Sequence, residues 1–184
     1  YKERLQIVEA DVTQHDHLQR LYEAAVEQGD LMLLINNAGT ANGRALSEAT
    51  IEEFEEVFEV NVSSAFELIK ICLPDLLSNH GTIGNISSIV GSVALPYLGI
   101  YSASKHALNA MTVALHLEHL ADDLRVILVE PGPLTSRLCG DAIAEGSRDG
   151  QRAMRMVVQR VGTKFGVATE QAATMIVRAL CRHQ

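Results

Sequence analysis

Apolar positions along the chain follow two patterns, continuous runs typical of buried strands and the three- and four-residue spacing of amphipathic helices. Four strands and four helices are predicted in alternation: strands at residues 5–12, 31–36, 81–88 and 124–130, and helices beginning near Thr13, Thr50, Ser102 and Thr169. Strands that alternate with helices form parallel sheets through right-handed crossovers. We therefore expect one α/β domain over residues 1–184, with an open, doubly wound parallel sheet covered on both faces.

Helix boundaries carry their own signals. Thr13 stands where an N-cap is expected, and Gly29 is placed to end the helix that follows. Thr50 and Glu53 have the spacing of a capping box, which predicts one long helix whose inner side runs to Leu76.

Charge and composition exclude several classes of function. The net charge of -8 with a sequence pI near 5.3 leaves no general basic surface, so no nucleic-acid partner is expected. No run of about 18 apolar residues and no charged-then-apolar leader is present, so we expect neither membrane spanning nor secretion. Cys72, Cys139 and Cys181 form no CxxC pair, which argues against a disulfide framework and a zinc site. A cytoplasmic protein is the simplest expectation.

A phenol and an ammonium stand four residues apart at Tyr101 and Lys105, on one face of a predicted helix. A nearby ammonium lowers the pKa of a tyrosine and makes it a usable proton donor and acceptor. Such a pair standing alone is more often solvated than catalytic. Ser88, at the end of a predicted strand, and Asn61, on the apolar side of a helix, change that balance. The alternative for Asn61 is a hydrogen-bonded amide of the core.

His116 and His119 have a helical spacing that is compatible with a metal site. The further ligands that such a site requires are not evident in the sequence. We expect a solvated or interface pair and no bound metal.

Five motifs occur in the order and approximate spacing typical of one enzyme family: NNAG at 36–39, VNVSSAF around Asn61, NISSIVG at 85–91, YSASK at 101–105 and PGPLTS at 131–136. Over nearly its whole length the sequence resembles the short-chain dehydrogenase/reductase family. The resemblance implies a Rossmann-like fold and an NAD- or NADP-dependent oxidoreductase, which interconverts an alcohol and a ketone or aldehyde by hydride transfer.

The resemblance also implies a catalytic tetrad of Asn61, Ser88, Tyr101 and Lys105. In that scheme Ser88 binds the substrate oxygen and Tyr101 exchanges a proton with it. Lys105 binds the ribose hydroxyls of the cofactor and lowers the pKa of Tyr101, and Asn61 holds a water of the proton relay. Fixed donors aimed at the oxygen where charge develops stabilise the transition state more than the ground state.

Cofactor contacts are implied at the ends of three predicted strands. By the resemblance, one group faces the adenine, the next lies on the adenosine ribose side and the third lines the nicotinamide side. These groups are Asp11 and Val12; Asn37, Ala38 and Gly39; and Pro131, Gly132 and Leu134. Ser136 stands where family members usually have threonine, with Thr135 beside it, so either hydroxyl is a candidate for the carboxamide contact.

The glycine-rich TGxxxGxG turn of the family is not found in this sequence. Relative to the family, the chain begins at the third strand and stops before the last one, so we expect these 184 residues to be part of a longer chain. Residues 5–12 then lack a neighbouring strand, and the apolar strand at 31–36 has an exposed edge.

The predicted partners are a small alcohol or carbonyl substrate, with apolar substrates favoured, and a second copy of the chain in a homodimer or homotetramer. Residues 133–165 are expected to form a mobile cover over the substrate. The alternative from a different class is a truncated, catalytically idle protein that acts only through its surfaces. A dehydratase or epimerase of the same fold is a lesser alternative.

Overall fold

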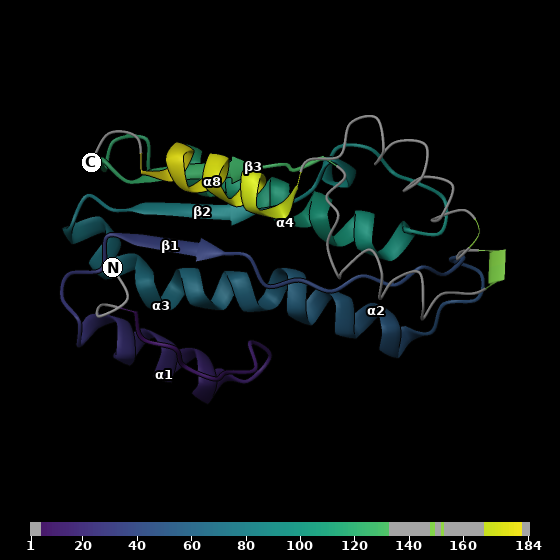
Figure 1. Ribbon diagram of the computed structural model, residues 1–184, viewed down its shortest axis with the longest axis horizontal. Helices are drawn as coiled ribbons and strands as arrows, with labels where there is room; N and C mark the ends of the chain where they lie inside the picture. Colours follow the sequence, from purple (N-terminus) through teal and green to yellow (C-terminus); the bar gives the residue numbers. More distant parts are fainter. Residues whose placement is uncertain (1–4, 133–147, 150–151, 153–167, 182–184) are drawn as a thin grey trace.

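The computed structural model describes residues 5–132, 148–149, 152 and 168–181. Its centre is a parallel sheet of three strands in the order β1-β2-β3 (Figure 1). The strands are β1 (Leu33–Asn36), β2 (Thr82–Ile86) and β3 (Arg125–Val129). They are in register, because Thr82 pairs with both Leu33 and Arg125. The predicted α/β class with a parallel sheet is confirmed.

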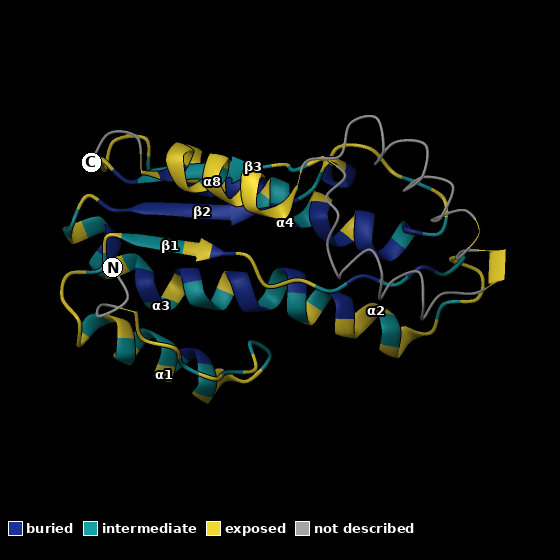
Figure 2. Cartoon of the chain, viewed as in Figure 1, coloured by how far each residue is buried: buried dark blue, intermediate teal, exposed yellow. Residues whose placement is uncertain are grey.

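Helices connect the strands and cover both faces of the sheet. They are α1 (His15–Val26), α2 (Ile51–Phe58), the π-helical turn η2 (Glu59–Ser63), α3 (Ser64–Ser78), the 3₁₀ turn η3 (Ile89–Gly91), α4 (Gly99–Glu118) and α8 (Thr169–Leu180). Successive residues of β2 point to opposite faces. Ile83 packs with side chains of α3 and α4, whereas Gly84 lies against Leu180 of α8. Figure 2 shows that β2 is buried along its whole length.

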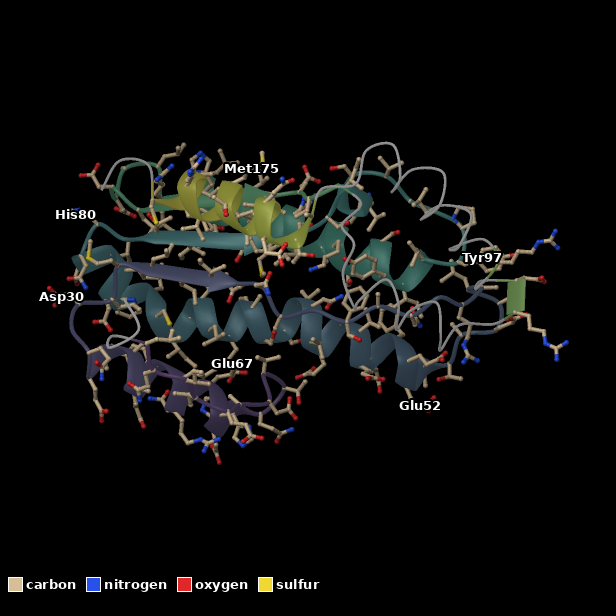
Figure 3. All side chains as sticks on the ribbon, in the orientation of Figure 1. Asp30, Glu52, Glu67, His80, Tyr97 and Met175 are labelled. Carbon is tan, nitrogen blue, oxygen red and sulfur yellow. The ribbon has the colours of Figure 1, made fainter. Side chains whose placement is uncertain are left out.

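Helix α1 is attached to the outer side of α3. Figure 3 shows Glu67 of α3 on the side that faces α1, where it pairs with His15. A second link is the hydroxyl of Tyr22, which donates a hydrogen bond of 2.6 Å to Asp75. The figures and these contacts agree that α3 lies between β1 and α1 (Figure 1).

Residues 5–12 do not form the predicted strand. They carry no strand assignment, and Leu5 and Ile7 are 73% and 85% exposed. Strand β1 pairs with β2 and, among the described residues, with no other segment, so one edge of β1 is free and Ile35 is 38% exposed. The prediction of a strand was wrong because a strand needs a neighbour for its backbone hydrogen bonds, and none is described beside these residues. Among the described residues, the edge of β1 away from β2 is therefore unpaired.

Two helices differ from the pattern-based expectation, one at its start and one in its continuity. Gln14, not Thr13, is the N-cap of α1, because the hydroxyl of Thr13 donates instead to Asp11 at 2.8 Å. The capping box of Thr50 and Glu53 is present as predicted. The single long helix is in fact α2 and α3 joined through the π-helical turn, which carries Asn61.

Within the described part of the chain, no helix is both long enough and apolar enough to cross a membrane. The same residues contain no cluster of three or more His, Cys, Asp or Glu side chains suited to a metal ion. His119 bonds with Asp122 at 2.7 Å. Most of the expected mobile cover, residues 133–165, lies outside the described residues.

Candidate active site

The carboxyl ends of the three parallel strands meet along one edge of the sheet, where ligands bind in open α/β folds. This edge carries Asn37 after β1, Ser88 after β2, and Pro131 and Gly132 after β3. The predicted catalytic and cofactor residues at these positions therefore share one edge.

Lys105 is buried at this edge, on α4. Its side chain is 3% exposed, and Nζ donates a hydrogen bond of 3.0 Å to the carbonyl oxygen of Ile86, the last residue of β2. No carboxylate among the described residues forms an ion pair with it. Burial without a counter-charge disfavours the ammonium and lowers the pKa of Lys105 from 10.5 to about 8.

Asn61 lies in the π-helical turn and is 1% exposed. Its Oδ1 accepts from the backbone N–H of Thr40 at 2.8 Å, and its Nδ2 donates to the carbonyl of Thr40 and to the hydroxyl of Ser104, both at 2.9 Å. The amide therefore joins the loop after β1 to helix α4. A π turn displaces the helical register by one residue and is frequent at functional sites.

Gly39 brings backbone close to two of these side chains. A Cβ at this position would stand 3.3 Å from Oδ1 of Asn61 and 3.6 Å from Nζ of Lys105. A side chain at position 39 would therefore crowd the amide of Asn61, and its absence lets the loop backbone approach both the amide and the ammonium.

Tyr101 is buried one turn before Lys105, whose Nζ is 5.9 Å from the centroid of the phenol ring. The ring lies in an apolar cluster that joins the loop after β1, η3 and the start of α4. The other members of this cluster are Ala41, Val90, Leu95 and Leu98. The phenol ring of Tyr101 is therefore packed against apolar side chains and lies near the ammonium of Lys105.

Ser88 is half-buried and is the N-cap of η3, where its Oγ accepts from the backbone N–H of Val90 at 3.4 Å. Turn η3 packs against α4. The preceding hydroxyl, that of Ser87, donates to the carbonyl of Lys105 at 3.4 Å. Ser88 is thus on an element in direct contact with the helix that carries Tyr101 and Lys105.

A cavity of about 160 Å³ opens beside this cluster, between the end of β1, α3 and the loop before α1. Val12, Asn37 and Ala38, all predicted cofactor residues, line it together with Asn36 and Asn61. Oδ1 of Asn36 is buried and has no hydrogen-bond partner among the described residues. The cavity is therefore lined mainly by apolar side chains, with the amide residues Asn36, Asn37 and Asn61 at its border.

The remaining predicted cofactor residues do not line this cavity or lie outside the described residues. Asp11 is exposed and does not line the cavity; the N–H and hydroxyl of Thr13 bond to its carboxylate and lower the pKa of Asp11. Pro131 accepts a bond of 3.0 Å from Ile89 N–H, and Gly132 is exposed. Leu134, Thr135 and Ser136 lie outside the described residues.

Two polar positions near the site were missed by pattern reasoning. Asn85 is fully buried in β2, where it accepts from Asn36 at 2.8 Å and donates to Thr112 at 2.9 Å. The sequence signal that could have identified Asn85 as a buried, hydrogen-bonded residue is the presence of an amide within an otherwise apolar strand. Asn109 of α4, which bonds to Gly91 and Glu130, gave no such signal, because its partners are set by the fold.

Comparison with known proteins places this geometry in context. The family model described as short chain dehydrogenase matches residues 1–145. A probable short-chain type dehydrogenase/reductase, VdlC of Helicobacter pylori, is 39% identical over 132 residues, covering 70% of this chain and 48% of its own. L-fucose dehydrogenase of Mus musculus is 32% identical over 174 residues, covering 94% of this chain and 64% of its own. The chain thus spans about half to two thirds of these relatives.

Two solved structures show the same fold. "ElxO with NADP Bound" is 26% identical, with a TM-score of 0.71, covering 78% of this chain and 60% of the other. "Crystal structure of KRED1-Pglu enzyme" is 22% identical, with a TM-score of 0.83, covering 95% of this chain and 73% of the other. At that identity the second likeness establishes the fold alone.

The lowered pKa of Lys105 gives a pH test. Between pH 8 and 10.5 the folded protein releases this proton while the unfolded chain retains it, so stability rises with pH. Relative to Lys105→Met, the wild-type free energy of unfolding should increase by on the order of 3 kcal/mol across this window. Urea unfolding of both proteins measures the difference. A difference that does not change with pH contradicts the burial of a titrating ammonium.

Proposed function

Because the chain belongs to the short-chain dehydrogenase family, we propose that it forms the catalytic core of an NAD- or NADP-dependent oxidoreductase that interconverts an alcohol and a ketone or aldehyde. The observation that carries the proposal is the buried ammonium of Lys105, which lies beside the Tyr101 ring and close to Gly39. A desolvated cation next to a phenol favours the phenolate and makes proton exchange possible near neutral pH.

The residues present fit a nicotinamide dinucleotide. Gly39 lets the loop backbone lie close to Lys105 and Asn61, and the neighbouring residues Asn37 and Ala38 line the cavity together with Val12. We assign these residues, with Asp11, Pro131 and Gly132, to cofactor binding, and Leu134 and Ser136 by the resemblance alone. The bound cofactor supplies or accepts the hydride. The NADP complex of ElxO, at 26% identity, and "Crystal structure of a short chain dehydrogenase/reductase SDR from Burkholderia phymatum in complex with NAD", at 25% identity, support either coenzyme.

Each member of the proposed tetrad has a separate task. The Ser88 hydroxyl donates a hydrogen bond to the substrate oxygen, and Tyr101 gives that oxygen its proton in reduction or removes it in oxidation. Lys105 stabilises the phenolate and binds hydroxyls of the cofactor. Asn61 keeps the loop after β1 in contact with α4, and we assign it a water of the proton relay. Donors fixed in a buried site lower the barrier more than donors in water.

An apolar substrate is proposed from the family resemblance, and the buried surroundings of Tyr101 are compatible with it. The ring is walled by Ala41, Val90, Leu95 and Leu98, none of which carries a polar side chain. The names of relatives point to substrates of different polarity. They include L-fucose dehydrogenase and a 3-ketodihydrosphingosine reductase of Bacteroides thetaiotaomicron. We propose a substrate of the second type for this chain.

A cytoplasmic homodimer or homotetramer is part of the proposal. Cys72 and Cys181, the cysteines of the described residues, are free thiols, as in a reducing compartment. Phe66 of α3 and Val113 and Leu117 of α4 are large apolar side chains left exposed, and a second copy of the chain would cover them.

Catalysis by Tyr101 has a direct test. Tyr101→Phe should lower the turnover number at least about 100-fold, because the proton donor is lost, while the dissociation constant for the dinucleotide changes little. Tyr22→Phe is the matched control, since that hydroxyl bonds to Asp75 away from the site. Unchanged turnover in Tyr101→Phe would sink the assignment.

Titration with NADH and NADPH, followed by nicotinamide fluorescence, separates the enzyme from the idle alternative. Saturable binding of one coenzyme, and net oxidation of that coenzyme with a carbonyl substrate, is the expected result. Net oxidation also excludes the dehydratase or epimerase reading. Absence of binding by the full-length protein would favour a protein that acts through its surfaces alone.

A further inference from the structure

We propose that Asn109 is a positioning residue of the reaction, which holds the Ser88 segment and the segment after β3 against the helix that carries Tyr101 and Lys105. The inference rests on the proposed function and adds to it a residue outside the tetrad. Asn109 stands one helical turn beyond Lys105 on the same face of α4.

The amide nitrogen of Asn109 spans three elements. Nδ2 donates to the carbonyl oxygen of Gly91 in η3 at 3.0 Å and to Oε1 of Glu130 after β3 at 2.8 Å. The same Oε1 accepts from the hydroxyl of Ser92 at 2.6 Å. An amide nitrogen has two hydrogens, so both are used, one for each neighbouring segment.

These bonds act directly on the segment that carries Ser88. The N–H of Gly91 donates to the carbonyl of Ser88 at 2.8 Å, and the N–H of Ile89 donates to the carbonyl of Pro131 at 3.0 Å. Gly91 is thus bonded on both sides. Its carbonyl oxygen accepts from Asn109 of α4, and its own N–H donates to the carbonyl of Ser88. A shift at position 109 would therefore move the Ser88 hydroxyl relative to Tyr101.

The contact is tight at Gly91. A Cβ there would stand 2.8 Å from Nδ2 of Asn109 and 2.7 Å from Oγ of Ser87, closer than real side chains approach. The backbone of η3 thus lies directly on the amide. Oδ1 of Asn109 is buried and has no hydrogen-bond partner among the described residues. The hydrogen bonds of this amide in the described residues are therefore the two that its nitrogen donates.

The test compares Asn109→Asp with wild type in the full-length enzyme. The carboxylate has nearly the same shape, but it has no N–H and adds a negative charge beside Glu130. We expect the turnover number to fall about tenfold or more, because a misplacement of about 1 Å costs up to about 100-fold. The KM for the dinucleotide should change by less than about threefold. An unchanged turnover number overturns the proposal.

Two further variants separate positioning from general stability. Asn79→Asp removes an amide that donates to Leu31 at 3.3 Å, outside the site, and should leave turnover unchanged. Adding Glu130→Gln to Asn109→Asp lets the new amide at 130 donate to the new carboxylate, and should recover part of the lost turnover. An equal loss in Asn79→Asp overturns the proposal, and absence of recovery overturns the part assigned to Glu130.

Amide hydrogen exchange provides a readout that does not depend on activity. In Asn109→Asp, and to a smaller extent in Asn109→Ser, exchange over residues 87–92 should accelerate while exchange in α4 around residues 101–105 stays as in wild type. Equal exchange rates over residues 87–92 in wild type and both variants would overturn the proposal that Asn109 holds the Ser88 segment against α4. If wild type binds no dinucleotide and shows no turnover, the proposed function fails, and the exchange data still decide whether Asn109 holds the Ser88 segment.

Discussion

The burial of the Lys105 ammonium at the carboxyl end of β2 is the constraint on which the site depends. A buried cation without a carboxylate is costly, and in the described residues its hydrogen-bond partner is the Ile86 carbonyl. The cost is visible as a pKa lowered to about 8. A structure that retains such a group gains from it elsewhere, and here the group lies beside Tyr101 and Gly39.

Amide side chains hold the walls around this cation in place. Asn61 joins the loop after β1 to α4, Asn85 joins β1 to α4 through Asn36 and Thr112, and Asn109 joins η3 and Glu130 to α4. Helix α4 is the common partner in all three cases. Because buried amides are worth most when their hydrogen bonds are made, these bonds stabilise the packing of the loop after β1, of β2 and of η3 against α4, the helix that carries Tyr101 and Lys105.

The sequence predicted the class of the fold and the neighbourhood of the site, since both follow from local patterns. Period and capping identified the strands at 31–36, 81–88 and 124–130 and the helix that begins after Thr50. The five motifs drew attention to Asn61, Lys105 and Gly39 separately, and the structure brings these three residues together. What failed depended on partners distant in the sequence. The apolar pattern of residues 5–12 cannot show whether a neighbouring strand is present, and period alone cannot show the π turn at Asn61. The partners of Asn109 are likewise set by tertiary structure.

The central claim is that the buried ammonium of Lys105 and the loop backbone at Gly39 form one binding site for a nicotinamide dinucleotide. A crystal structure of the full-length protein with its preferred coenzyme tests it most directly. The account predicts nucleotide density against residues 37–39, with Nζ of Lys105 within hydrogen-bond distance of a coenzyme hydroxyl. Density elsewhere on the protein, with Lys105 still bonded to Ile86 alone, would contradict it.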